Sequence, residues 1–135
     1  MTFEGQYLSY AEYQNLGGSA IGLMPFNLLE FESRKQIDLR TFNRLVGKSE
    51  IPQEVKLCDY RLINELQGYI KETQTIARNG SIASESIDGY SVSYATLGNI
   101  SEIIKSKKQD IDDIVRTYLL NVVYENEHLM YAGVD

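Results

Sequence analysis

Apolar residues recur at steps of three and four along much of the chain, which is the spacing of helices with one buried face. The longest such pattern predicts a helix over residues 52–78, which begins after Ile51 and ends before Gly80. Its apolar face comprises Val55, Cys58, Leu62, Leu66 and Tyr69. A similar pattern predicts a helix over residues 99–120, whose stripe comprises Ile100, Ile103, Lys107, Ile111, Ile114, Tyr118 and Val122.

Two further helices are predicted in the first third of the chain. Ser9 and Glu12 have the spacing of a capping box, which predicts a short helix over residues 9–16 that ends at Gly17. Pro25 suits the first turn of a second helix, predicted over residues 25–46 and ended by Gly47. Its apolar positions are Phe26, Leu29, Ile37, Phe42 and Leu45.

A polar segment, SIASESIDGYSVSY, separates the third and fourth predicted helices. Tyr90, Val92 and Tyr94 alternate with serines, as in a strand, and Asp88-Gly89 is a turn dipeptide. The pattern predicts a hairpin loop over residues 81–95, which has little apolar surface of its own and needs support from the helices or from another chain. Residues 121–135 have no helical period and are predicted to form an extended tail.

These patterns predict a mainly α fold: a small bundle of about four helices with an inserted β-hairpin or long loop and an extended C-terminal tail. The chain has 135 residues, which suits a single domain over residues 1–135. Its net charge of −6 argues against nucleic-acid binding by phosphate neutralisation. No apolar run is long enough to span a membrane, and the N-terminus lacks the basic and apolar parts of a signal peptide. We therefore expect a cytosolic or cytosol-assembled protein without membrane contact.

Candidate chemistry is sparse. The single cysteine, Cys58, lies on an apolar helix face and is predicted to be a core residue. The single histidine, His128, lies near acids but has no nucleophile with an orienting partner beside it. Asp110, Asp112 and Asp113 lack the ligand spacing of a calcium loop, and a solvated helix face paired with neighbouring lysines is the better interpretation. We expect no catalytic residues, no metal site, no cofactor and no enzymatic activity.

Two groups of residues have both a structural and a functional interpretation. The second predicted helix has a dense mixed-charge face, which is either a solvent face or a charged subunit interface, formed by Glu30, Glu32, Arg34, Lys35, Asp38 and Arg40. The chain has ten tyrosines and no tryptophan. Tyrosine suits interfaces because it is large, rigid and half polar, but tyrosines also cover the edge of a small core. The sequence leaves both alternatives open.

Five segments, taken in order, resemble one family. They are YAEYQNLGG, KQIDLRTFNRL, IPQEVKLCDYRLI, IASESIDGYSVSY and HLMYAGVD. Together they are similar to the head–tail connector (adaptor) proteins of long-tailed bacteriophages, the kind encoded in phages and prophages of Gram-positive bacteria. The resemblance extends from about Ser9 to Asp135, which is nearly the whole chain.

The resemblance implies a structural protein of the virion neck, assembled in the host cytoplasm. Such proteins form a ring, usually twelve-fold, that docks on the portal protein and joins it to a stopper or tail-completion protein. Double-stranded DNA passes through the ring without sequence-specific binding. The implied subunit or neck interface comprises Ile82, Asp88, Gly89, Tyr90, Val92 and Tyr94. The implied portal-docking tail comprises Leu129, Met130, Tyr131, Gly133, Val134 and Asp135.

Two alternatives remain at this point. One is a cytosolic protein–protein interaction module, in which the polar segment adds a strand to a partner's sheet. The other is a different phage neck protein, a stopper or a tail-completion protein. Those folds are mostly β-rich, and four helical patterns argue against them.

Overall fold

The computed structural model describes residues 4–18, 21–79 and 105–130, and it describes their side chains except those of residues 72–79. The helices are α1 (Tyr10–Asn15), α2 (Leu23–Arg40), α3 (Gln53–Asn79) and α6 (Lys108–Leu119). Strand β1 (Val123–Tyr124) pairs antiparallel with β2 (Glu127–His128). The predicted mainly helical fold of about four helices is confirmed. The small sheet lies near the C-terminus, whereas the hairpin predicted over residues 81–95 lies outside the described residues.

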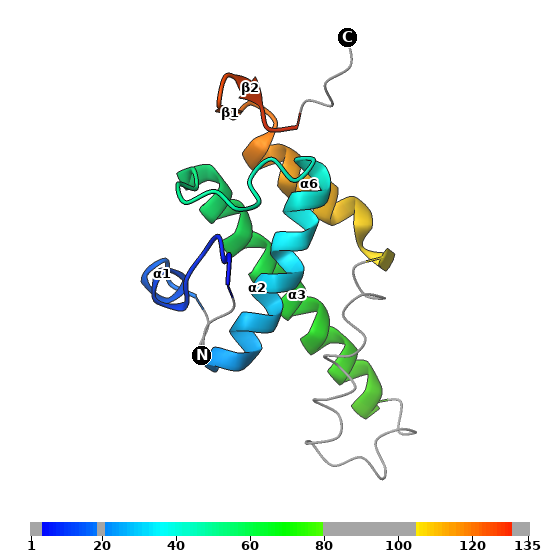
Figure 1. Cartoon of the computed structure of the whole chain (residues 1–135). Coiled ribbons are helices and arrows are strands. Elements are labelled where there is room, and N and C mark those ends of the chain that lie inside the picture. The colour runs from blue at the N-terminus through cyan, green and yellow to red at the C-terminus, as the bar shows by residue number, and fades with distance from the viewer. Residues whose placement is uncertain (1–3, 19–20, 80–104, 131–135) are drawn as a thin grey trace.

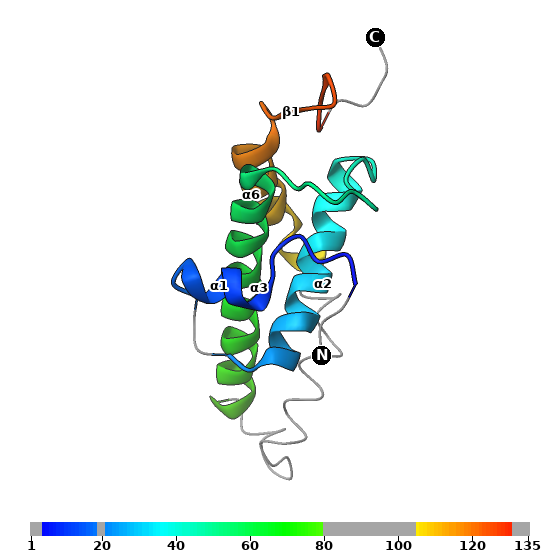
Figure 2. The same ribbon diagram turned by 60° about the vertical axis from the view of Figure 1, so that its left-hand side comes forward.

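Helix α3 is the centre of the arrangement, since both α2 and α6 pack against it. Figure 1 shows α2 crossing α3, with α6 and the small sheet at the upper end. Figure 2 shows the N-terminal segment running across the helices before it enters α1. The body is therefore a short helical bundle with an N-terminal segment laid over one side.

The core is built from the apolar stripes that the sequence predicts. All five residues of the third predicted helix's face are buried, and Cys58 is fully buried as expected. Burial raises the pKa of the Cys58 thiol, which keeps it in the neutral form. The ring of Tyr13 joins α1 to this core, with centroid distances of 5.2 Å to Phe26 and 5.5 Å to Tyr60.

Helix α1 begins and ends as predicted. The Ser9 hydroxyl accepts from the Glu12 amide at 3.1 Å, and the Glu12 carboxylate accepts from the Ser9 amide at 2.9 Å. This reciprocal capping box satisfies amides that a helix start otherwise leaves unpaired. Gly17 then takes a φ of +93°, which ends the helix in the left-handed region that glycine occupies without strain.

Helix α2 differs from the prediction at both ends. It begins at Leu23, so that Pro25 is its third residue rather than its first. It ends at Arg40 instead of residue 46, because Phe42 and Asn43 take left-handed φ values of 56° and 59°. The apolar residues beyond Arg40 follow the helical spacing only by coincidence, although Leu45 still reaches the core.

Helix α6 begins at Lys108, after a break at Lys107. Lys107 is the one polar residue in the predicted stripe, and its ammonium lies 5.4 Å from the centre of the Tyr69 ring. The predicted start, residues 99–104, lies outside the described residues.

The segment predicted as an extended tail turns back on itself. Val123 pairs with His128, and Glu125 and Asn126 form the turn with φ values of 51° and 70°. Two consecutive left-handed residues give the turn whose twist matches that of paired strands. A period of two over such short strands is too brief to be read from the sequence, so the prediction missed this hairpin.

Candidate functional site

The C-terminal hairpin is fixed to the segment that joins α2 and α3. Arg44 donates from Nη1 to the Leu129 carbonyl at 2.9 Å, and its Nη2 lies 3.6 Å from the Glu127 carboxylate. Lys48 pairs with Glu125 at 3.2 Å across the same contact. Four segments lie together at this end of the molecule, which we call the hairpin end (Figure 1). They are the C-terminal end of α2, residues 41–50, the C-terminal end of α6 and the β1–β2 hairpin.

Leu129 anchors this end from within, because its side chain is 0% exposed in the core and its amide donates to the Val122 carbonyl at 2.9 Å. Leu129 belongs to the predicted portal-docking tail, and its contact with a portal stays a prediction. Met130 is partly buried against the same core. The other residues of the expected docking tail, Tyr131, Gly133, Val134 and Asp135, lie outside the described residues.

The hairpin end also carries exposed apolar side chains. Five of the eight large apolar residues that are exposed among those described belong to its segments. They are between 42% and 66% exposed: Leu39, Phe42, Val46, Leu120 and Val123. Phe42 is notable because a bulky residue is rarely left-handed, and its ring is half exposed with the Arg44 guanidinium 5.5 Å away. Exposed apolar groups at one end of a molecule are typical of a protein–protein contact surface.

A second unusual region lies along α2, where polar side chains are buried. Residues 4–9, here called the N-terminal strap, cover a stripe of α2 formed by Asn27, Glu30, Arg34 and Asp38. These four residues stand three and four positions apart, so they share one helix face. In the same order, the strap meets them through Gln6, the Tyr7 amide, the Glu4 carbonyl and the Tyr7 hydroxyl.

The contacts of the strap are specific. Gln6 donates to the Asn27 amide oxygen at 2.8 Å, and the Tyr7 amide donates to Oε2 of Glu30 at 3.0 Å. The Tyr7 hydroxyl donates to Asp38, and Nη1 of Arg34 donates to the Glu4 carbonyl at 2.9 Å. Burial, followed by the Asp38 carboxylate, raises the pKa of the Tyr7 hydroxyl. It therefore remains a donor throughout the physiological range.

The mixed-charge face of α2 is therefore not the solvent face that the sequence suggested for all six residues. Glu30, Arg34 and Asp38 are buried, whereas Glu32 and Arg40 are intermediate and Lys35 is exposed. The physical reason is that the strap supplies partners that the helix itself cannot supply. Gly5 permits the closest approach: its φ is +77°, and a Cβ there would lie 2.9 Å from Nη1 of Arg34.

Beneath the strap, the buried carboxyl groups of Glu30 and of Asp59 on α3 lie close enough for each to affect the pKa of the other. Asp59 is 0% exposed. Burial, followed by the nearby Glu30 charge, raises the pKa of Asp59 well above its usual range. Burial also raises the pKa of Glu30, although Asp59, Arg34 and the Tyr7 amide act against this shift.

The sequence contained a signal for this pair. Asp59 stands four residues after Val55 and three before Leu62, which places an acid on the apolar stripe of α3. Glu30 stands in the same way between Phe26 and Ile37 on α2. An acid on the buried face of a helix needs a hydrogen-bond partner in the interior. Two such acids on adjacent helices can be partners for each other when one of them is protonated.

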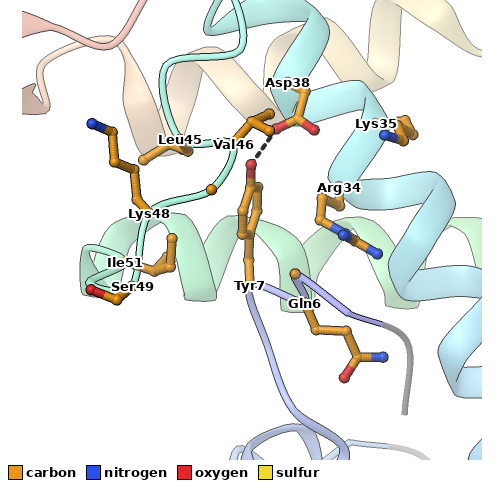
Figure 3. A pocket seen from close by; sticks show the side chains of 12 residues that line it. Gln6, Tyr7, Arg34, Lys35, Asp38, Leu45, Val46, Lys48, Ser49 and Ile51 are labelled. Atoms are coloured by element: carbon orange, nitrogen blue, oxygen red, sulfur yellow. Dashed lines mark hydrogen bonds between the residues drawn. The ribbon is translucent and has the colours of Figure 1, made fainter.

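A cavity of about 300 Å³ adjoins the strap between α2 and the segment 45–51. Figure 3 shows Tyr7 standing between these two walls, with its hydroxyl directed at Asp38. Arg34 and Lys35 line one wall, and Leu45, Val46, Lys48 and Ile51 line the other. The strap itself, through Gly5, Gln6 and Tyr7, closes one side of this cavity.

The other candidate residues are held in ordinary pairs or lie apart. Asp112 forms an ion pair with Arg40 of α2, not with Lys108 as expected. Asp110 accepts from the Tyr69 hydroxyl at 3.3 Å, and Asp113 accepts from Gln109 at 3.0 Å. His128 is exposed in β2. Within residues 4–18, 21–79 and 105–130, no three His, Cys, Asp or Glu side chains are placed to hold a metal ion.

The predicted subunit interface cannot be located, since Ile82, Asp88, Gly89, Tyr90, Val92 and Tyr94 lie outside the described residues. Among the described tyrosines, several have a role within the subunit, and the interface alternative stays a prediction. Tyr7, Tyr13 and Tyr69 are buried, which is the core role. Tyr124 instead tethers the hairpin, because its hydroxyl donates to the Glu50 carbonyl at 3.0 Å.

A comparison of the sequence with protein-family models finds no match, and searches of curated proteins and of solved structures find none either. Among the helices in the described part of the chain, none combines the length and apolarity needed to cross a membrane.

Proposed function

We propose that this protein is a structural connector of a bacteriophage neck, which forms a ring on the portal protein and joins it to a stopper or tail-completion protein. The observation that carries the proposal is the hairpin end, where exposed apolar side chains surround a hairpin that is fixed to the body. The order of the five sequence segments that resemble connector proteins supplies the kind of partner.

A connector subunit needs a surface for the adjoining neck protein as well as the head-to-tail contacts that close its ring by rotation. The hairpin end offers one such surface, since Phe42, Val46 and Val123 are each more than half exposed. The second surface is assigned to the residues of the polar segment 81–95, on the sequence resemblance alone. We assign the hairpin end to the contact with the next protein of the neck, because Arg44 and Lys48 hold the hairpin there as a rigid unit.

The charge of the chain suits a DNA channel. A net charge of −6 repels packaged DNA, so the wall of such a ring would not retain the genome during its passage. The proposed location is the virion neck, after assembly in the host cytoplasm.

The proposal is tested by mixing the purified protein with the portal protein encoded beside it and measuring the mass and symmetry of the complex by electron microscopy. A variant with both Phe42→Asp and Val123→Asp should lose the complex while it keeps its helical circular-dichroism spectrum. Met24→Asp is the matched control, because Met24 is 45% exposed at the opposite end of α2. It should assemble as the unchanged protein does.

Two results would count against a connector. One is an unchanged protein that remains separate from the portal under all assembly conditions. The other is normal assembly of the doubly substituted variant, which would remove the hairpin end from the contact. Capture of a non-virion partner by the polar segment, without any portal complex, would favour the alternative of a cytosolic interaction module.

A further inference from the structure

Glu30 and Asp59 form a buried acid pair that lacks donors. Neither Oδ1 nor Oδ2 of Asp59 accepts a hydrogen bond from a donor group of the described residues, and Oε1 of Glu30 accepts none. Two ionised carboxylates in contact repel strongly in a poorly solvated site. One proton on the pair removes this conflict, because it turns one carboxyl group into a donor for the other.

The geometry decides which acid holds the proton. Oε2 of Glu30 accepts the Tyr7 amide, and Oε1 lies 3.3 Å from Nε of Arg34. Both contacts favour an ionised Glu30. Asp59 has neither contact and is enclosed completely, so the proton resides on Asp59 and is donated to Glu30. The direction of the Asp59 pKa shift agrees with this arrangement.

The surrounding charges do not compensate a second negative charge on the Glu30–Asp59 pair. From α2, Arg34 and Asp38 face the pair; from the strap, Tyr7 does; and Cys58 is adjacent on α3. Arg40, also on α2, is held by Asp112 of α6. Among the described residues, Arg34 is therefore the one cation against the pair, and it already forms an ion pair with Glu30.

The same pair holds the strap. Glu30 accepts the Tyr7 amide, and its partner Arg34 holds the Glu4 carbonyl. A doubly charged pair must be hydrated, and the cavity lined by Gly5, Gln6 and Tyr7 reaches Arg34, the ion-pair partner of Glu30. Hydration of the pair and docking of the strap therefore exclude one another.

We propose that Glu30 and Asp59 are a proton-binding site, and that loss of their single proton releases the N-terminal strap from α2. In this step the Asp59 O–H bond breaks, the proton passes to hydroxide and forms water, and the charge left on Asp59 drives water in beside Tyr7. The proposal is independent of the connector function, since it concerns the subunit alone.

The test is a pH titration of the ¹³C-labelled carboxyl groups by NMR, together with hydrogen exchange of the Tyr7 amide corrected for its intrinsic pH dependence. Asp59 should titrate in a step far above the ordinary value of about 3.9. Between that ordinary value and the step, the protection of the Tyr7 amide should fall about tenfold per pH unit, since opening then releases one proton, and above the step it should level off. The Leu62 amide, inside α3, should keep its protection.

Asp59→Asn supplies the decisive variant, because an amide donates to Glu30 without a titratable proton. Its Tyr7 amide should stay protected at every pH where the core is folded. Asp113→Asn is the matched control: Asp113 is exposed on α6, and the substitution should leave the pH step intact.

Three outcomes would overturn the proposal. They are an Asp59 carboxyl that titrates near its ordinary value, Tyr7 protection that stays constant from that value up to the Asp59 step, and the same loss of Tyr7 protection in Asp59→Asn as in the unchanged protein. Should Asp59→Asn fail to fold, Glu30→Gln takes its place. Removal of the like charge should then shift the Asp59 step to lower pH, and an unmoved step would equally refute the pair.

Discussion

At the scale of single residues, the feature that governs this protein is an acid on the buried phase of a helix. Asp59 is enclosed beside Cys58 and Leu62, where an isolated carboxylate would be costly. In the proposed pair, Glu30 from α2 lowers this cost by accepting a hydrogen bond from the protonated Asp59 carboxyl group. The N-terminal strap completes the arrangement, since Tyr7 supplies donors to Glu30 and to Asp38.

Asp59→Asn should alter the pH dependence of stability. The folded state holds a proton on Asp59 that the unfolded chain releases near pH 3.9, so the free energy of unfolding falls as pH rises from that value to the raised pKa. The variant lacks this loss and should gain stability relative to the unchanged protein as pH rises, by about 1.4 kcal/mol for each pH unit in that window. Urea unfolding between pH 4 and pH 9 measures the difference. Parallel pH curves would show that Asp59 titrates normally.

Tyr7→Phe should destabilise the strap without disturbing the helices. The substitution removes the hydroxyl that donates to Asp38 and leaves a buried acceptor with one donor fewer. A loss of about 1–3 kcal/mol is expected for such a group. Tyr10→Phe is the comparison variant, because it removes a hydroxyl outside the strap that donates to the Ile21 carbonyl and not to a carboxylate. Equal losses in both variants would argue that the Asp38 contact has no special role.

At the scale of elements, the two ends of α2 and the C-terminal segment show how local backbone and tertiary contacts share control. Phe42 and Asn43 stop α2 in left-handed conformations, which turns the chain so that Arg44 and Lys48 can hold the hairpin. The hairpin in turn places Leu129 in the core. The exposed ring of Phe42 is left without a partner in its own core, which is consistent with a contact role.

Leu129→Ala should unfasten the hairpin from the body. Truncation of a fully buried leucine removes apolar contact and leaves a cavity, at a cost of about 2–5 kcal/mol in the free energy of unfolding. Val123→Ala, at a position 58% exposed on the same hairpin, should change stability by less than about 0.5 kcal/mol. Thermal unfolding of the two variants makes the comparison. Similar effects would place Leu129 outside the cooperative core.

Phe42→Gly should make the free subunit more stable and its assembly weaker. Glycine relieves left-handed strain of about 1–2 kcal/mol at φ 56°, which exceeds the backbone entropy of about 0.5–1 kcal/mol that glycine loses on folding. It also removes an exposed ring from the proposed contact. Leu39→Gly, at a helical and exposed position of α2, should instead lose about 1 kcal/mol. Denaturant unfolding and portal binding are measured together, and a loss of stability in Phe42→Gly would contradict the strain.

At the scale of the whole molecule, the chain combines a self-sufficient core with surfaces that the core does not use. The helices α2, α3 and α6 bury the apolar stripes, and the strap covers the polar stripe of α2. Under the proposed function, the exposed apolar residues of the hairpin end and the polar segment 81–95 serve contacts with partners. Assembly and folding should therefore respond to different substitutions.

Tyr90→Asp and Val92→Asp should weaken assembly more than folding. Both residues belong to the polar segment that the family resemblance assigns to subunit contacts, and a charge in such a contact costs desolvation without a partner. The helical circular-dichroism signal and unfolding midpoint should stay within the error of the unchanged protein, while ring formation declines in light scattering. Unfolding of the free subunit by either substitution would instead assign the segment to the core.

The sequence by itself determined the helical class, the capping of α1, the extent of α3 and the burial of Cys58. These follow from local spacing, because apolar residues at steps of three and four fall on one face only when the chain is helical, and that face can then be buried. Tertiary structure alone decided that α2 ends at Arg40, that residues 123–128 form a hairpin, and that Glu30, Arg34 and Asp38 are buried. Each depends on a partner distant in sequence, the strap or the segment 41–50, and periodicity carries no information about which distant residue will meet a charged side chain.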